Sequence, residues 1–143
     1  MRFDLTTRAS PQQVLAAMTD FTDHRPQIWS TLDPDIYEVR ELGDTWAVAR
    51  EGSPHSPFWV VVQYDWSDPR VIRWRELETN HGDGGDGSMR IEPNGAGGSR
   101  VHVEWSTHPV RLRDKMAIFV LHHTMNPVIA RMWAKALDRY ALS

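Results

Sequence analysis

The sequence predicts an α+β fold in which an antiparallel sheet wraps around a long C-terminal helix. Residues 113–141 form one long stretch with helical periodicity, and most of the chain before it divides into short alternating segments joined by turns. Two short helical signals stand between the first and second of these segments. Short turns between successive strands require antiparallel pairing, and a long apolar helix needs a large partner surface.

The N-terminal region predicts one strand followed by two short helices. Phe3, Leu5 and Thr7 alternate with polar residues, as in a strand with one buried face. The segment Ser10-Pro11-Gln12-Gln13 then begins a helix, because Ser is a good N-cap, Pro suits the first helical position and Gln can complete a capping box. A second short helix is predicted for residues 26–32. The apolar side of the first helix consists of Val14, Leu15, Ala17 and Met18.

Six further strands are expected along the chain. They are predicted at residues 36–42, 45–51, 58–66, 71–80, 88–93 and 99–107. Gly43-Asp44 is typical of a hairpin turn, and seven of the nine glycines lie in two loops, at 82–87 and 94–98. The order is therefore β-α-α-β-β-β-β-β-β-α, with seven strands.

Alternation along the strands indicates which side chains face the core. The apolar side of residues 58–66 matches Ile72 and Trp74 of the next strand if the connection holds an odd number of residues, for example 67 to 71. A slip of one residue would turn every side chain to the other face. The apolar side of residues 58–66 consists of Phe58, Val60, Val62, Tyr64 and Trp66. The same reasoning turns four polar residues inward: Glu41, Arg50, Glu76 and Thr107.

The C-terminal helix is amphipathic in its second half and has a flaw at Asn126-Pro127. Six consecutive apolar residues, 116–121, are too many for a helix that is buried on one side only. One side of the helix consists of Phe119, His122, Asn126, Ile129, Ala130, Trp133, Leu137 and Tyr140. The other side consists of Arg131, Lys135, Asp138 and Arg139.

Composition excludes several classes of function. A net charge of −3 argues against an electrostatically driven nucleic-acid binder, and the lack of cysteine excludes disulfides, thiolate catalysis and cysteine-ligated metals. No segment approaches the roughly 20 apolar residues of a membrane span, and the N-terminus lacks the apolar core of a signal peptide. We therefore expect one cytoplasmic domain spanning residues 1–143, as a monomer or a homodimer.

The chain contains seven tryptophans, which suit either plain core packing or a pocket for a flat or apolar ligand. A curved sheet around a helix often leaves such a pocket. Its walls are expected to include Trp29, Tyr37, Trp46, Val62, Tyr64, Trp74, Trp105, Phe119 and Trp133.

Polar residues on the expected pocket side are the candidates for chemistry. His122 can act as a general acid or base near neutral pH, and Asn126 can orient a carbonyl group. Alternatively, His122 bonds to a strand backbone and Asn126 serves as the N-cap of a new helix at Pro127. Arg50 and Glu76 can pair across the intervening strand or hold a polar ligand group, unless they lie at the sheet edge in solvent. Tyr64 can donate a hydrogen bond to a ligand or simply pack in the core.

No metal site or cofactor is expected. The segment 81–86, His-Gly-Asp-Gly-Gly-Asp, lacks EF-hand spacing and occurs once, whereas glycine-rich calcium motifs need several copies. There is no phosphate-binding loop, dinucleotide fingerprint or serine-hydrolase elbow.

The order of elements and three segments resemble the START/Bet v1-like (SRPBCC, helix-grip) superfamily, and within it the polyketide cyclase/dehydrase-like proteins. The segments are residues 20–29 (DFTDHRPQIW), residues 64–69 (YDWSDP) and residues 131–137. The resemblance implies a helix-grip fold: a seven-stranded antiparallel sheet around the C-terminal helix, with two short helices after strand 1 and an apolar cavity. Members bind lipids, sterols, hormones or polyketides, and some are cyclases, dehydratases or hydrolases. The superfamily has no universal catalytic residues, so the resemblance assigns none.

Three functions remain open. The first is binding of a small hydrophobic or aromatic molecule, lipid- or polyketide-like, between the helix and the sheet. The second is a cyclase or dehydratase in which His122, helped by Arg50 or Tyr64, moves a proton and polarises a carbonyl. The third is a protein-interaction module whose core is filled.

Overall fold

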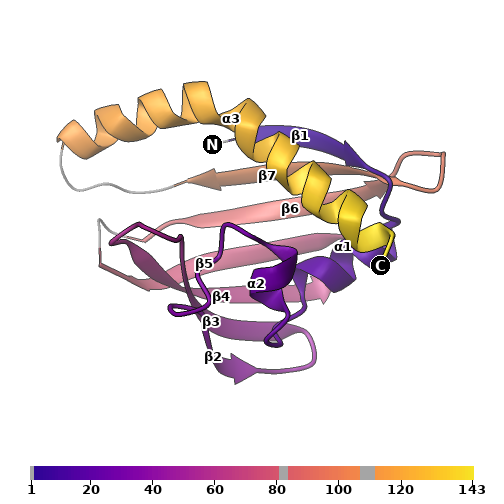
Figure 1. The fold of residues 1–143 in the computed structure, drawn as a ribbon, viewed down its shortest axis with the longest axis horizontal. Helices are drawn as coiled ribbons and strands as arrows, with labels where there is room; N and C mark the ends of the chain where they lie inside the picture. Colours follow the sequence, from indigo (N-terminus) through magenta and orange to yellow (C-terminus); the bar gives the residue numbers. More distant parts are fainter. Residues whose placement is uncertain (1, 81–83, 107–111) are drawn as a thin grey trace.

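The sheet has seven antiparallel strands in the order β1-β7-β6-β5-β4-β3-β2 (Figure 1). The computed structural model describes residues 2–80, 84–106 and 112–143, with the side chains of 112–126 excepted. The strands are β1 (Arg2–Thr7), β2 (Glu38–Leu42), β3 (Trp46–Gly52), β4 (Trp59–Asp68), β5 (Val71–Thr79), β6 (Asp86–Pro93) and β7 (Ser99–Ser106). The predicted sheet, its number of strands and their antiparallel pairing are confirmed.

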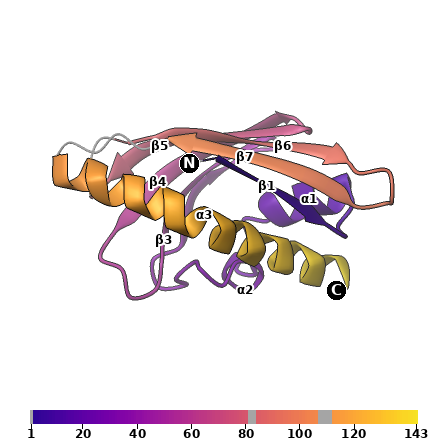
Figure 2. The same cartoon turned by 90° about the horizontal axis from the view of Figure 1, so that it is seen from above.

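Three helices, α1 (Pro11–Met18), α2 (Arg25–Ile28) and α3 (Leu112–Ala141), lie on one side of the sheet, as Figure 2 shows. We name the side of the sheet that faces them the inner face. The helix α3 is continuous through Pro127, so no new helix begins there. Its direction changes between the orange and yellow halves in Figure 1, as expected where proline removes a backbone donor. Among the described residues, no helix is long and apolar enough to cross a membrane.

Local signals set the ends of the shorter elements. The hydroxyl of Ser10 accepts from the backbone N–H of Gln13 at 3.2 Å, and the Gln13 side chain accepts from the N–H of Ser10 at 2.9 Å, which is the predicted capping box. The loop between β6 and β7 turns at Gly95 and Gly97, whose φ angles of 85° and 88° favour glycine.

The core fills the space between the inner face, α1 and the second half of α3. Alternate residues of β1, β7, β6 and β5 point into it and are fully or almost fully buried, and Ala136 and Leu137 of α3 cover them. The strand residues of this core are Phe3, Leu5, Val101, Val103, Met89, Ile91 and Ile72.

The predicted register between the fourth and fifth strands is confirmed. Tyr64 pairs directly with Trp74, so both rings lie on the inner face, where their centroids are 6.4 Å apart. The turn itself is tighter than predicted, because Asp68 already pairs with Val71 and a bulge follows Asp65. The bulge accommodates the shorter turn, so the side chains before it keep the predicted orientation.

The predicted facing of β3 is wrong. Ala47 and Ala49 are the buried inward residues, which leaves Trp46 and Arg50 on the outer face. Sequence alternation favours Trp46 inside because it is the larger apolar residue. The alanines take that face because the rings of Phe21, Tyr37 and Tyr64 cover them.

Trp46, Arg50 and Glu41, which were predicted to point inward, lie on the outer side of the sheet. Trp46 is 38% exposed and lies over Gly43, where an added Cβ would collide with the indole. The Nε of Arg50 donates to the carbonyl of Ile36 at 3.0 Å, and its guanidinium lies 3.8 Å from Glu38. Glu41 is also exposed, because a bulge after Val39 makes it pair with the outward Val48.

The expected polar side of α3 also needs one correction. Asp138 is half-buried rather than solvated: its carboxylate accepts from the hydroxyl of Thr7 at 2.7 Å and from the N–H of Arg8 at 2.8 Å. These bonds attach the end of α3 to the end of β1. Thr107 and the side chains of Phe119, His122 and Asn126 lie outside the described residues.

On the outer face, His102 of β7 connects two carboxylates. Its Nδ1 lies 2.7 Å from Asp4 of β1 and its Nε2 lies 2.9 Å from Glu104. The hydrogen bonds to Glu104 and then to Asp4 raise the pKa of His102 above its ordinary value of 6.5. The protonated ring therefore stabilises the edge of the sheet.

We predict that thermal stability falls as pH rises past 6.5 and through the raised pKa of His102. The folded state binds this proton more tightly than the unfolded state, so the stabilisation is complete below the unfolded pKa and is lost above the folded one. Thermal unfolding of the wild type and of His102→Gln across this range measures the effect. Equal pH dependence in the two proteins would contradict the role of His102.

Candidate functional site

A row of aromatic side chains crosses the inner face from β4 to α3. The rings of Trp74 and Trp105 have centroids 6.4 Å apart, and Trp105 stacks on Trp133 of α3 at 6.1 Å. Tyr64 continues the row on β4, and Trp29 continues it beyond Trp133 at 5.6 Å. These distances lie in the range in which aromatic pairs attract each other. The row is thus a continuous apolar surface built from five separate segments.

The row depends on the absence of a side chain at Gly87. This residue pairs with Trp74 on one side and with Trp105 on the other. A Cβ at this position would lie 2.5 Å from the Trp74 ring and 2.6 Å from the Cβ of Trp105. The glycine therefore lets two indoles meet across the strand between them.

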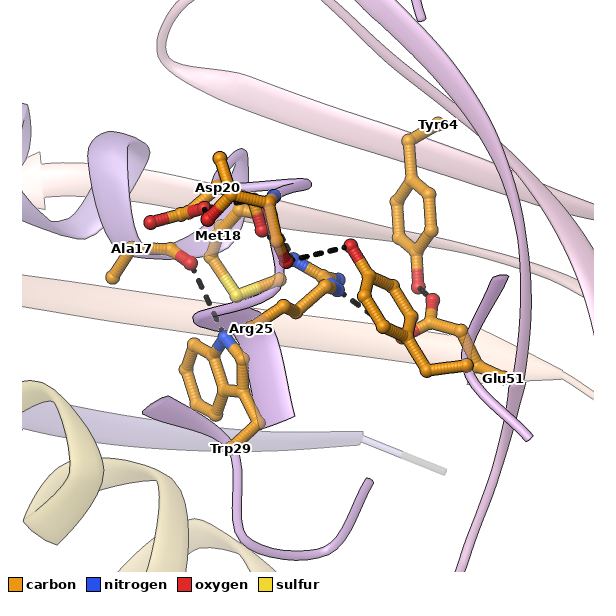
Figure 3. A network of polar contacts seen from close by, with 9 residues as sticks. Ala17, Met18, Asp20, Arg25, Trp29, Glu51 and Tyr64 are labelled. Atoms are coloured by element: carbon orange, nitrogen blue, oxygen red, sulfur yellow. Dashed lines mark hydrogen bonds and ion pairs between the residues drawn. The ribbon is translucent and has the colours of Figure 1, made fainter. Parts of the chain in front are cut away.

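A buried ion pair lies beside this row (Figure 3). The side chain of Arg25 is 4% exposed, and its Nε donates to Oε2 of Glu51 at 3.2 Å. The other carboxylate oxygen, Oε1, accepts from the hydroxyl of Tyr64. One carboxylate on β3 thus connects α2 with β4.

The rest of the Arg25 side chain is also in contact with protein. Its Nη1 donates to the carbonyl of Met18 at 2.7 Å, which is the last residue of α1, and to that of Asp20 at 3.3 Å. A cation at this position also complements the dipole of α1. The guanidinium lies 4.2 Å from the ring centroid of Phe21 and 5.4 Å from that of Tyr64. These contacts offset the cost of burying the charge.

The electrostatics keep the groups of this network in defined protonation states. Burial raises the pKa of Tyr64 well above its ordinary value, the Glu51 carboxylate raises it further, and Arg25 opposes both. Burial also raises the pKa of Tyr37 to about 12, again against the influence of Arg25. Burial is the largest influence on the pKa of Arg25 and lowers it, but Glu51, Tyr64 and Tyr37 together outweigh burial, so the net shift is upward. Both tyrosines are therefore hydrogen-bond donors at neutral pH, and Arg25 is a cation.

The structure brings most of the sequence-predicted wall residues together. On the inner side, or packed against it, are Trp29, Tyr37, Val62, Tyr64, Trp74, Trp105 and Trp133. Trp46 and Arg50 lie on the outer face and do not contribute. Glu76 is half-buried, and its carboxylate accepts from the backbone N–H of Gly85 at 2.9 Å rather than pairing with Arg50.

Sequence reasoning did not find Arg25 or Glu51. Arg25 precedes a proline in a four-residue helix, where no periodicity indicates which side is buried. The predicted alternation of β3 was wrong by one residue, and it therefore put the side chain of Glu51 on the outer face. The available signal was the pair Ala47 and Ala49, since two small residues on one strand face leave space for larger groups from elsewhere.

Among the described residues, no three His, Cys, Asp or Glu side chains are grouped so that they could hold a metal ion.

We predict that Glu51→Leu destabilises the protein by about 3–5 kcal/mol, because it leaves the Arg25 cation buried without its carboxylate. The double variant Arg25→Met, Glu51→Leu should recover much of this loss, since it removes both charges. Urea denaturation of the two variants and the wild type measures the difference. A single variant as stable as the wild type would show that the ion pair is not buried in solution.

The fold is shared with solved structures of low sequence identity. The protein TTHA0849 from Thermus thermophilus is 16% identical, with a TM-score of 0.78 over 99% of this chain and 96% of that one. Norcoclaurine synthase from Thalictrum flavum is 14% identical, with a TM-score of 0.74 over 100% and 86%. The Zhui aromatase/cyclase from a Streptomyces species is 17% identical, with a TM-score of 0.72 over 98% and 92%. At these identities the likeness shows the fold alone.

A search of curated proteins gives no match. The family model described as "Polyketide cyclase / dehydrase and lipid transport" matches residues 3–141, which is nearly the whole chain. This match establishes that the chain belongs to the polyketide cyclase/dehydrase and lipid transport family.

Proposed function

We propose that the protein binds a small, planar aromatic molecule between α3 and the inner face of the sheet. The observation that carries this proposal is the incomplete burial of the aromatic row. Tyr64, Trp74, Trp105 and Trp133 are each half-buried, although they lie on the inward side of their elements. By contrast, Ile72 on the same face is fully buried. Partly covered aromatic surface on an inward face is characteristic of ligand sites.

The buried ion pair supports a polar end to this site. The Glu51 side chain is 14% exposed, and each of its two oxygens already accepts one hydrogen bond. A carboxylate has further lone pairs, so it can accept another bond from a ligand hydroxyl group. A flat ring with one hydroxyl substituent therefore fits both parts of the site.

The first test is binding of 2-naphthol, a flat apolar ring with one hydroxyl group. We predict that Trp74→Ala weakens its binding by about tenfold or more, because the ligand loses an aromatic contact. The matched control is Trp46→Ala, which removes the same kind of side chain from the outer face and should leave affinity unchanged. Titration calorimetry measures both dissociation constants.

Thermal unfolding establishes that both variants are folded before their affinities are compared. Equal affinities of wild type and Trp74→Ala would contradict an inner-face site, as would an equal loss in the two variants.

A cyclase or dehydratase remains the second candidate, and the Glu51–Tyr64 contact favours it. A carboxylate held by a buried guanidinium can take a proton from an enolisable carbon. The hydroxyl of Tyr64, which then no longer donates to the protonated Glu51, can donate its one hydrogen bond to the resulting enolate oxygen. Arg50 has no part in this version, since it lies on the outer face. The role considered for His122 stays a prediction.

For this candidate, Glu51→Gln should lower turnover of a poly-β-ketone by about 100-fold while the protein still binds the substrate. The same change at Glu76, which bonds to a backbone N–H instead, is the control. Turnover that is unaffected by Glu51→Gln would exclude this residue as the base.

A further inference from the structure

The side of α3 that faces away from the sheet carries an unusual set of residues. We name this set the outward α3 face. All its members are exposed, and each lies three or four residues from at least one other, so they share one side of α3 and of the turn that follows it. The outward α3 face consists of Val128, Arg131, Met132, Lys135, Arg139 and Leu142.

Its charge is of one sign only. Arg131, Lys135 and Arg139 are cations. The single acidic residue of 127–143, Asp138, bonds to Thr7 and Arg8 at the end of β1. Within the described part of the chain, none of these three cations has a carboxylate at ion-pair distance. The face is therefore positive although the whole chain has a net charge of −3.

Apolar side chains are interspersed with the cations. Val128 is 41% exposed, Met132 is 40% exposed and Leu142 is 80% exposed. Each stands within one helical turn of a cation. Anionic headgroups attract Lys and Arg, and exposed apolar side chains can enter the boundary of the acyl region, so this side of α3 offers both kinds of membrane contact.

We propose that the outward α3 face docks on an anionic membrane surface. Its cations would contact lipid headgroup phosphates, and its three apolar side chains would enter the boundary of the acyl region. A convex helix face suits a broad, flat partner better than a peptide, which usually needs a groove or a free strand edge. The opposite side of the same helix covers the inner face, so docking leaves the aromatic row unobstructed. This proposal does not depend on the ligand.

The test compares binding of the full chain to two kinds of vesicle by co-sedimentation: phosphatidylcholine alone, and phosphatidylcholine mixed with phosphatidylglycerol. We predict binding to the mixed vesicles and much weaker binding to the neutral ones. The triple variant Arg131→Gln, Lys135→Gln, Arg139→Gln should lose affinity for the mixed vesicles by about tenfold or more. Added salt should weaken wild-type binding, because it screens the attraction.

The matched control neutralises three exposed arginines on the outer face of the sheet, Arg73→Gln, Arg75→Gln and Arg90→Gln. It changes the net charge by the same amount and should keep its affinity. Thermal unfolding confirms that both triple variants are folded. Absence of binding to mixed vesicles would overturn the proposal, and so would equal losses in the two variants. Binding of an acidic protein to this face without any vesicle binding would overturn it as well.

Discussion

The buried guanidinium of Arg25 is the constraint on which the candidate site depends. It connects the end of α1, the loop before α2 and the carboxylate of Glu51 on β3, with Tyr64 as the next partner. A buried charge is tolerated only when it is paired and hydrogen-bonded, so none of these partners can move away without a large cost. The α1–α2 segment is thereby fixed on the inner face, where its Trp29 meets the end of the aromatic row.

The inner face has two parts, which differ in how completely the helices cover its side chains. Towards β1 and β7 it is filled, because α1 and the second half of α3 press on closely packed aliphatic residues. Along the aromatic row the covering is incomplete, and the indoles reach each other only because Gly87 has no side chain. Thus one face of the sheet carries a fully buried core and, beside it, a half-buried aromatic row.

Much of the fold follows from the sequence because its signals are local. Alternating apolar and polar residues predicted the strands, and the Ser10–Gln13 capping box predicted the start of α1. The long stretch with helical periodicity predicted α3. Which side chains of a strand point towards the core was harder to predict. On β3 the larger apolar residues point outward, and the alanines point inward because the rings of Phe21 and Tyr64, from distant segments, cover them. Arg25 and Glu51 are 26 residues apart, and no local pattern marks residues that meet only in the folded chain.

The most direct test of the ligand site is a titration with 2-naphthol that follows the indole N–H signals of the seven tryptophans by ¹H–¹⁵N NMR. Each indole gives its own signal, so the experiment locates the ligand on the molecule. A site on the inner face predicts that the signals of Trp74, Trp105 and Trp133 shift together, while that of the outward Trp46 stays in place. Shifts confined to Trp46, or no shifts at saturating ligand, would contradict the account.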